Sequence, residues 1–420
     1  MNEDRILAKY WIETPWPVDQ AVDVMAGEQS CGTFIRVPGE TEELRARFGA
    51  RVDRIDLKEA VDQPSLPGSR APRGNTRPRY QRAEVTLSFP LENLGPSLPN
   101  LQATVAGNLF ELSQFSGLRL LDLELPPAFA KAYPGPQFGI EGTRRLSGVE
   151  GRPLIGTIVK PSVGLSPRDT AELVRRLAEA GLDFVKDDEL MADPPHSPLK
   201  DRVQAVMTVV NDHAQRTGKK VMVAFNITGE IDEMRRRHDL VLAAGGTCVM
   251  ASLNSIGLPA LAELRRHSAL PIHGHRNGWG MLARCPALGI SFVAMQKLWR
   301  LAGADHLHTN GLRNKFFEGD DSVVASARAC LTPQHGDRRV MPVLSSGQWA
   351  GQAPDTYRAL ESLDLMYLCG GGILAHAGGP AAGVASIRQA WEAALEGRTL
   401  EQAASTHPEL RQAIETYGSK

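Results

Sequence analysis

The chain contains the stretch Gly181-Leu-Asp-Phe-Val-Lys-Asp-Asp-Glu189, in which a short apolar run ends in charged side chains. The apolar residues stop at Lys186, and the carboxylates of Asp187, Asp188 and Glu189 follow at once. Oxygen ligands crowded at a strand end are what Mg²⁺ requires. An ammonium repels a cation, so the lysine fits such a site only if its amine is neutral or has reacted with CO₂ to form a carbamate. The alternative is a charged loop with Lys186 paired to a neighbouring acid, since exposed ion pairs are common and nearly neutral in energy.

A regular alternation of apolar runs and amphipathic stretches surrounds this segment from Arg152 onward. The alternation gives about eight strand-plus-helix units, the number that closes a (β/α)₈ barrel. Strands this short and this uniformly apolar are typical of a parallel sheet that is covered on its outside. The expected strands are residues 154–159, 184–186, 221–226, 248–251, 271–275, 306–308, 341–344 and 366–369.

The first part of the chain has a different pattern, in which strand-like and helix-like segments do not alternate regularly. Residues 6–12 and 84–89 are predicted strands, and residues 18–28 are a predicted helix. We therefore expect an α+β (ferredoxin-like) domain over residues 1–131. A Pro/Gly-rich connection starts the second domain, a TIM barrel over residues 132–420 that ends in helices.

The composition excludes several classes of protein. With 420 residues, 42% of them hydrophobic, and a net charge of -1, the chain has no electrostatic basis for binding nucleic acid or an anionic membrane. Its sequence has no apolar run long enough to span a bilayer, and its first residues lack the pattern of a signal peptide. The five cysteines are scattered and form no Cys-x-x-Cys pair. We expect a cytoplasmic protein with reduced thiols.

In a (β/α)₈ barrel, functional residues gather where the strands end. A glycine triplet follows the last expected strand, where backbone N–H groups can bind phosphate, although a tight turn is the alternative. Arg276 has the geometry of a phosphate clamp, and a surface arginine is its alternative. The polar or glycine residues at these ends are Lys160, Lys186, Asn226, His275, Arg276, His308, Ser345, Gly347, Gly370, Gly371 and Gly372.

Two His-x-His pairs, His273/His275 and His306/His308, end neighbouring strands. We expect one histidine of each pair to face the barrel interior, with His275 and His308 nearest the mouth. Two core histidines are the alternative for an isolated pair.

Two lysines have plausible roles at the mouth. The loop after His308 is long enough to act as a lid that excludes water, and Lys315 within it would bring a positive charge onto bound substrate. A solvated loop lysine is the alternative. Lys160 ends an apolar strand, so it is either paired with an acid or desolvated for proton transfer.

Three segments together resemble the large subunit of ribulose bisphosphate carboxylase/oxygenase (RuBisCO), and more closely its RuBisCO-like relatives: Gly27–Thr33, Gly151–Pro161 and Phe184–Glu189. The resemblance extends over nearly the whole chain and implies roles for matching residues. Lys186 resembles the carbamylated lysine, with Asp188 and Glu189 as Mg²⁺ ligands. The remaining implied roles are the acid/base lysine (Lys160), the histidines around the sugar phosphate (His275, His308), the lid lysine that meets a carboxylate (Lys315), one phosphate or polar end (Arg276, His308, Ser345) and the other end (Thr33, Gly347, Gly370, Gly371).

The resemblance also implies an obligate homodimer, because Glu28, Thr33 and Asn108 match residues that reach into a neighbouring subunit's site. One departure changes the expected reaction: Ser162 stands where the carboxylase has a second lysine, which removes a charge beside Lys160. True carboxylation is therefore not expected.

The retained Lys315 indicates a substrate with a carboxylate beside a ketone, and the expected ligand is a phosphorylated sugar acid. The resemblance implies decarboxylation of such a β-keto acid, 3-oxo-isoapionate 4-phosphate, to a ketopentose phosphate. The alternatives are a transcarboxylase/hydrolase on the same substrate and an enolase/isomerase of 5-methylthioribulose 1-phosphate. A non-catalytic sugar-phosphate sensor is the alternative from a different class.

Overall fold

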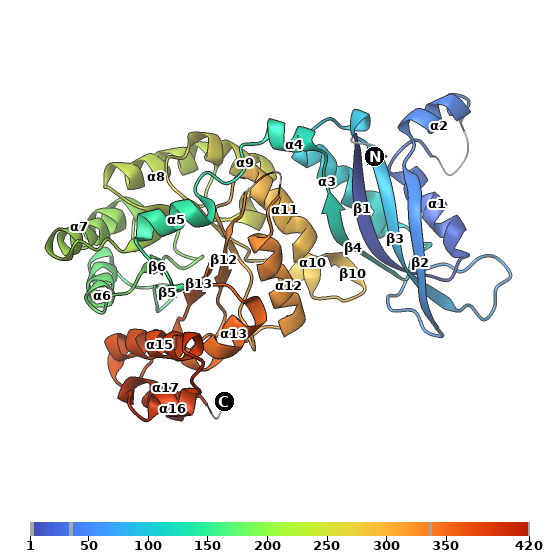
Figure 1. Cartoon of the computed structure of the whole chain (residues 1–420). Helices are drawn as coiled ribbons and strands as arrows, with labels where there is room; N and C mark the ends of the chain where they lie inside the picture. Colours follow the sequence, from blue (N-terminus) through green and yellow to red (C-terminus); the bar gives the residue numbers. More distant parts are fainter. Residues whose placement is uncertain (1–3, 33–36, 335, 337, 419–420) are drawn as a thin grey trace. The chain divides into compact units, whose positions relative to one another are not determined.

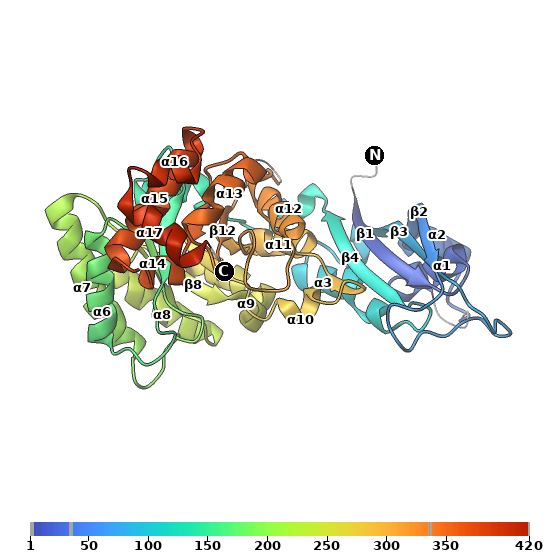
Figure 2. The ribbon, with the colours of Figure 1, turned by 90° about the horizontal axis from the view of Figure 1, so that it is seen from below.

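A computed structural model describes residues 4–32, 37–334, 336 and 338–418. The chain forms two compact units. Unit 1 consists of Met1–Pro134 together with Gly278–Leu301, and unit 2 consists of Gly135–Asn277 together with Ala302–Lys420. Figures 1 and 2 show the ribbon in two views.

Unit 1 is built on a five-stranded sheet in the order β10-β4-β1-β3-β2, and the pairs among β1 to β4 are antiparallel. With α1 and α2 between β1 and β2, and α3 between β3 and β4, this is the ferredoxin-like arrangement, as predicted. Figure 1 shows β1, β2 and β3 side by side. The elements are β1 (Arg5–Thr14), α1 (Val18–Glu28), α2 (Glu42–Phe48), β2 (Arg51–Val61), β3 (Tyr80–Pro90), η1 (Leu91–Asn93), α3 (Leu98–Ala106), η2 (Asn108–Glu111), β4 (Gly117–Glu124), α4 (Pro127–Ala132), α10 (Gly280–Ala283), β10 (Leu288–Ile290) and most of α11 (Phe292–Ala302).

Unit 2 contains the predicted closed barrel, in which neighbouring strands are parallel and follow the order β11-β12-β13-β5-β6-β7-β8-β9. The strands are β5 (Leu154–Ile158), β6 (Phe184–Lys186), β7 (Met222–Asn226), β8 (Cys248–Ser252), β9 (Ile272–His275), β11 (His306–His308), β12 (Met341–Leu344) and β13 (Met366–Leu368). The helices are α5 (Gly139–Ser147), α6 (Pro167–Glu179), α7 (Leu199–Thr217), α8 (Ile231–Ala243), α9 (Leu253–His267), α12 (Asp320–Leu331), η3 (Ala350–Gln352), α13 (Ala353–Leu360), α14 (Gly371–Leu374), α15 (Gly379–Leu395), α16 (Leu400–Ala404) and α17 (Pro408–Tyr417).

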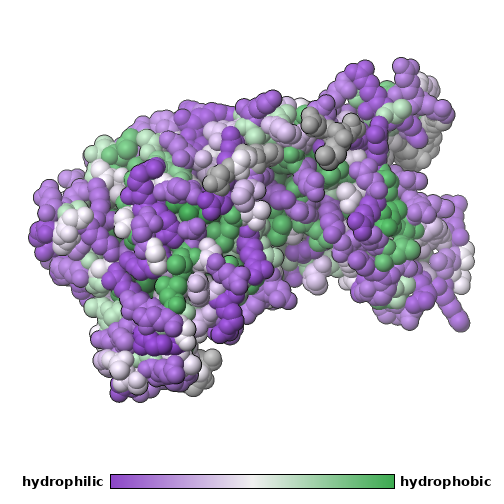
Figure 3. Space-filling view, in the orientation of Figure 1, coloured by the Kyte–Doolittle hydropathy of each residue, from purple (hydrophilic) through white to green (hydrophobic). Residues whose placement is uncertain are grey.

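Helix α6 shows why the outer helices form where they do. Ser166 is its N-cap and accepts a hydrogen bond from the Asp169 backbone N–H, while Pro167 occupies the first turn, where no N–H is needed. Its buried residues recur at helical spacing, so one face packs on the barrel and the other is solvated. Hydrophilic residues also dominate the visible face of α15, α16 and α17 in Figure 3.

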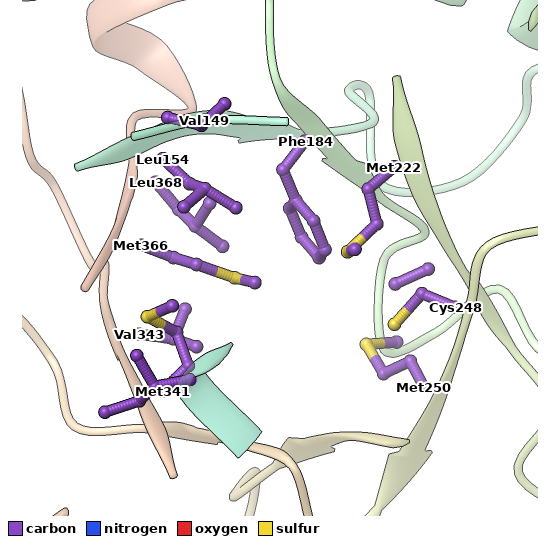
Figure 4. Close-up of a cluster of buried hydrophobic side chains, with 12 residues drawn as sticks. Val149, Leu154, Phe184, Met222, Cys248, Met250, Met341, Val343, Met366 and Leu368 are labelled. Atoms are coloured by element: carbon purple, nitrogen blue, oxygen red, sulfur yellow. The ribbon is translucent and has the colours of Figure 1, made fainter. Parts of the chain in front are cut away.

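The barrel interior is filled by apolar side chains that point toward one another beneath the strand ends (Figure 4). Phe184, Met222, Met250 and Met366 belong to this layer and are almost completely buried. Truncating a side chain of this size to alanine costs about 2–5 kcal/mol in such a core. The core therefore gives the polar residues above it a rigid base. Among the described helices, none is long and apolar enough to cross a membrane.

Candidate functional site

The charged residues that follow β6 form one cluster with the lysine that follows β5. Lys186 Nζ donates a hydrogen bond to the Asp187 carbonyl oxygen at 2.7 Å and lies 3.6 Å from Glu189 Oε2. Lys160 Nζ lies 2.6 Å from Asp188 Oδ2. The structure therefore brings together the three predicted metal ligands and the predicted acid/base lysine. Of the two alternatives for Lys160, pairing with an acid is the one observed.

A buried ion pair holds the loop that carries these carboxylates. Arg202, on α7, donates to Asp187 Oδ2 at 3.2 Å and to the carbonyl oxygens of Met191 and Ala192 at 2.7 Å. Asp187 Oδ2 also accepts from the Asn226 backbone N–H at 3.0 Å. Asp187 is thus turned away from the cluster formed by its neighbours. Breaking one partner of such a pair costs about 3–5 kcal/mol, so Arg202 fixes the loop that the sequence showed only as charged.

The electrostatics of the cluster suit a cation bound by oxygen ligands. Burial lowers the pKa of the Lys186 amine, against the opposing effect of the nearby carboxylates, and so makes the neutral form that reacts with CO₂ more accessible. Burial would raise the pKa of Asp188, but the hydrogen bonds from Lys160 and from the Leu190 backbone N–H hold it below its usual value. Two carboxylates and a buried amine beside them fit Mg²⁺ with a lysine carbamate.

The pKa of Glu189 depends on two neighbouring side chains. Burial would raise its pKa, but His275 and Lys186 hold it below its usual value. Burial lowers the pKa of His275 to about 4, so this histidine is neutral at pH 7. His275 therefore acts on Glu189 as a cation only in acid.

Both histidines of each His-x-His pair face the barrel interior, so the prediction of one inward histidine per pair was wrong. Side chains two residues apart in a strand point to the same face. His273 Nε2 lies 2.8 Å from His308 Nε2, His273 Nδ1 lies 3.3 Å from His306 Nδ1, and the rings of His275 and His308 are centred 4.4 Å apart. His308 Nδ1 contacts Ser345 Oγ at 3.1 Å, so two predicted site residues meet there.

These histidines are neutral at pH 7. Burial lowers the pKa of His306 to about 3, and it lowers the pKa values of His273 and His308 well below the ordinary value. Neutral imidazoles can donate hydrogen bonds to hydroxyl and ketone oxygens and can accept them from hydroxyl groups.

Arg276 meets an acid that the sequence did not single out. Its Nη2 is hydrogen-bonded to Glu318 Oε2, and the side chains of the pair are only 6% and 7% exposed. Glu318 Oε2 also accepts from Asn310 Nδ2 at 2.7 Å, and its Oε1 accepts from Ser322 Oγ at 2.8 Å. Glu318 stands close to Asp320 and Asp321 in the sequence, and nothing in that acidic run distinguishes it as the partner of Arg276, 42 residues earlier.

The expected lid, residues 309–319, lies against the loop that follows β12. The Lys315 backbone N–H donates to the Ser346 carbonyl oxygen at 3.0 Å, and a Cβ placed on Gly347 would lie 3.6 Å from the Lys315 Cβ. Asn310, Arg313 and Ser346 have left-handed backbones, with φ of 61°, 46° and 75°. Such strain in residues other than glycine concentrates at ligand-binding loops.

The glycine triplet divides into two roles. A Cβ on Gly372 would lie 2.6 Å from the Gln348 carbonyl oxygen, so Gly372 is required by packing. A Cβ on Gly371 would meet nothing within 4 Å, and one on Gly370 would meet only Ile158 Cδ1 at 3.9 Å. The backbone of Gly370 and Gly371 therefore borders open space that a ligand can enter.

The predicted site residues of unit 1 are partly described. Glu28 ends α1 and Asn108 begins η2, and both side chains are exposed on elements that pack together. Thr33 lies outside the described residues.

A second group of possible metal ligands joins α8 to α9. Asp239 Oδ1 lies 2.9 Å from His238 Nδ1 and 2.7 Å from His267 Nε2. The Ala269 backbone N–H donates to His238 Nε2 at 3.1 Å, so the ring proton must be on Nδ1, the atom that would have to bind a metal. The hydrogen bonds of this group join the two helices.

The chain matches two family models in turn. Residues 1–129 match the ribulose bisphosphate carboxylase large chain, N-terminal domain, and residues 139–417 match the ribulose bisphosphate carboxylase large chain, catalytic domain. The chain is 57% identical over 413 residues to a 3-oxo-isoapionate-4-phosphate transcarboxylase/hydrolase of Xanthobacter autotrophicus, covering 98% of this chain and 99% of that protein. It is 50% identical over 415 residues to a 3-oxo-isoapionate-4-phosphate decarboxylase of Rhizobium etli, covering 98% of each.

A solved structure gives the same result. The crystal structure of a rubisco-like protein from Burkholderia fungorum superposes with a TM-score of 0.92 at 50% identity, covering 99% of this chain and 100% of that one. With both domains matched and this identity over nearly the full length, the chain belongs to the ribulose bisphosphate carboxylase large-chain family, among its RuBisCO-like members.

Proposed function

We propose that the protein is a Mg²⁺-dependent decarboxylase of a β-keto acid sugar phosphate, 3-oxo-isoapionate 4-phosphate, and forms a ketotetrose phosphate in carbohydrate catabolism. A five-carbon acid that loses CO₂ keeps four carbons, so the expectation of a ketopentose phosphate was wrong. The observation that carries this proposal is the cluster in which Lys160 contacts Asp188 at 2.6 Å beside Lys186 and Glu189. A proton donor next to a cation site is what decarboxylation of a β-keto acid needs. Relatives at 50% and 48% identity that carry the name 3-oxo-isoapionate-4-phosphate decarboxylase support the choice of substrate.

Lys186, as its carbamate, together with Asp188 and Glu189 would hold Mg²⁺. When bound, the ion supplies positive charge beside the substrate oxygens on which negative charge develops. The rest of the chemistry belongs to side chains of this chain.

The bond between the substrate and its carboxyl carbon breaks, CO₂ leaves, and the electron pair stays on the sugar. Lys160 Nζ then delivers a proton to the sugar carbon from which CO₂ has left. Its ammonium is oriented by Asp188 Oδ2 at 2.6 Å and Ser162 Oγ at 2.7 Å. A hydroxyl in place of a second lysine leaves Lys160 without a cationic neighbour at that position.

The neutral histidines and the lid would position the substrate. His275 and His308 can hydrogen-bond its hydroxyl and ketone oxygens, and Ser345 supports His308 at 3.1 Å. Lys315 would bind the carboxylate as the lid closes and excludes water. Gly347, Gly370 and Gly371 would bind the phosphate with backbone N–H groups, while Arg276 would line the opposite, polar end.

A homodimer is part of this proposal. Glu28 and Asn108 are exposed together in unit 1, as residues that reach a partner's site would be. Thr33 would join them. We further propose a cytoplasmic location, consistent with cysteines that are all free.

One observation favours a second candidate, a transcarboxylase/hydrolase on the same substrate. A relative of that name is 57% identical, against 50% for the decarboxylase named above. Both activities begin by removing the carboxyl group, but a transcarboxylase must reattach it to another carbon before water cleaves the product.

The two candidates differ in the fate of one carbon. Purified protein with Mg²⁺ and the substrate labelled with ¹³C in its carboxyl group should release the label as CO₂ and leave a ketotetrose phosphate, both visible by NMR. Label retained in an acid cleavage product would establish the hydrolase instead. Unchanged substrate would reject both, and turnover of 5-methylthioribulose 1-phosphate would establish the isomerase.

A further inference from the structure

The guanidinium of Arg276 forms an ion pair with the carboxylate of Glu318. Glu318 approaches it from the end of the lid, and the side chains of both residues are more than nine-tenths buried. The carboxylate is fixed independently of the arginine by Asn310 Nδ2 at 2.7 Å and Ser322 Oγ at 2.8 Å. The Asn314 side chain adds a hydrogen bond to the Glu318 carbonyl oxygen at 2.9 Å. Glu318 is therefore part of the built structure of this end of the mouth.

The charge balance differs between the two ends of the mouth. Arg276 follows β9 and is paired, whereas Gly370 and Gly371 follow β13, which is three strands away from β9 around the barrel through β11 and β12. His308 lies on β11, the strand beside β9, and carries no charge at pH 7, because burial lowers its pKa well below the ordinary value. A phosphate brought to Arg276 would meet a carboxylate and a neutral imidazole. A phosphate at the glycines would meet backbone N–H groups.

The Glu318 side chain cannot rotate away from Arg276 without breaking other hydrogen bonds. Three side chains hold its two carboxylate oxygens, and a Cβ on Gly311 would lie 2.2 Å from the Gln348 side chain, so the lid base is closely packed. A second phosphate could bind Arg276 only by displacing a buried anion that is already hydrogen-bonded, and like charges brought together in a buried site are strongly disfavoured.

We propose that Glu318 determines substrate specificity by neutralising Arg276, so that the site accepts sugar derivatives with one phosphate and excludes bisphosphates. This inference rests on the proposed function only in taking the barrel mouth as the substrate site. The end of the substrate that faces Arg276 carries a neutral hydroxyl group, which the Glu318 and His308 side chains can hydrogen-bond. The single phosphate lies at the glycine end.

Direct binding measurements test this inference without turnover, so its failure can be told apart from failure of the proposed reaction. The ligands are ribulose 5-phosphate and ribulose 1,5-bisphosphate, titrated calorimetrically into the full chain with Mg²⁺. The wild-type protein should bind the bisphosphate no more tightly than the monophosphate. Bisphosphate binding that is tighter by tenfold or more would overturn the proposal whether or not any variant folds.

Glu318→Gln removes the charge, and its single amide oxygen can still accept from Asn310 while its amide nitrogen can donate to Ser322 Oγ. It should tighten bisphosphate binding by on the order of tenfold or more, because like-charge repulsion is lost, and should change monophosphate binding by less than about threefold. The matched control is Asp321→Asn, an exposed acid two residues after the lid, which should change neither.

The double variant Arg276→Gln/Glu318→Gln completes the test. If Glu318 acts by neutralising Arg276, the gain in bisphosphate affinity should disappear in the double variant. A gain that persists without the guanidinium would contradict this mechanism, as would an unchanged affinity ratio in a folded Glu318→Gln protein.

Discussion

Lys186 Nζ lies 3.6 Å from Glu189 Oε2, at the point where strand β6 ends and the carboxylate loop begins. The lysine side chain is only 1% exposed, and its pKa is lowered by burial. A buried amine beside two acids has a structural use, as half of an ion pair, and a chemical one, as the precursor of a carbamate.

The two uses make different predictions for Lys186→Ala. If the carbamate holds the metal, the substitution should abolish Mg²⁺-dependent turnover, because one of three ligands is lost. The measurement is CO₂ release with and without Mg²⁺, together with ¹³C NMR of protein equilibrated with ¹³CO₂, which should show a carbamate signal only in the wild type. Lys200→Ala, an exposed lysine on α7, is the matched control and should keep full activity. Activity surviving in Lys186→Ala would refute the carbamate role.

Lys160→Gln should lower the turnover number by on the order of 10²–10⁴, the usual contribution of a positioned proton donor. The amide can still donate to Asp188, so substrate binding should change far less. In D₂O the wild type should place deuterium on one face of the product carbon, whereas residual turnover in the variant should label both faces, since solvent then delivers the proton. Stereospecific labelling that survives in the variant would assign the proton transfer to another group.

The barrel and most of its strand ends could be predicted because the information is local. An apolar run followed within one or two residues by a charged or glycine residue marks both a strand and the point where it ends, as at Phe184 to Lys186. The same logic correctly located the β12 and β13 ends, where Ser345, Gly370 and Gly371 follow.

The features that were missed depend on partners far along the chain or on solvent-facing patterns. Glu318 acquires its role from Arg276, 42 residues earlier. Strand β2 is an edge strand with mostly exposed or half-exposed residues, so it lacks the apolar pattern of a core strand. The three-residue β10 pairs with β4, about 170 residues away, as Gly289 pairs with Arg119. Composition within a short window contains none of this information.

Lys315→Met should distinguish ligands that carry a carboxylate from those that do not. A hydrogen bond to a charged group contributes about 1.5–3 kcal/mol, and tenfold in affinity corresponds to about 1.4 kcal/mol. We therefore expect affinity for the β-keto acid to fall roughly tenfold to a hundredfold, while affinity for the ketotetrose phosphate product changes less than about threefold. Competition titrations with each ligand measure this ratio. Equal losses for both ligands would show that Lys315 binds some other part of the sugar phosphate.

His306 gives a prediction for stability against pH. Burial lowers its pKa to about 3, whereas in the unfolded chain it has the ordinary value of 6.5. Between these values the unfolded state binds more protons, so the contribution to stability is complete above about pH 6.5 and is lost as the pH falls toward 3. Each unit of depression corresponds to about 1.4 kcal/mol. Other buried histidines contribute to the same loss of stability in acid, so the wild type should lose stability steeply below pH 6.5.

His306→Gln should reduce the loss of stability below pH 6.5 without abolishing it. The glutamine does not titrate, so between pH 8 and pH 5 the variant should lose less unfolding free energy than the wild type, by up to about 1.4 kcal/mol per pH unit below 6.5. Urea unfolding at the two pH values measures the difference. The comparison at pH 8, where the imidazole is neutral in both states, gives the cost of replacing the imidazole's contacts with Thr143 at 2.8 Å and His273 at 3.3 Å. An identical pH dependence in both proteins would mean that His306 takes up its proton as readily inside the barrel as in the unfolded chain.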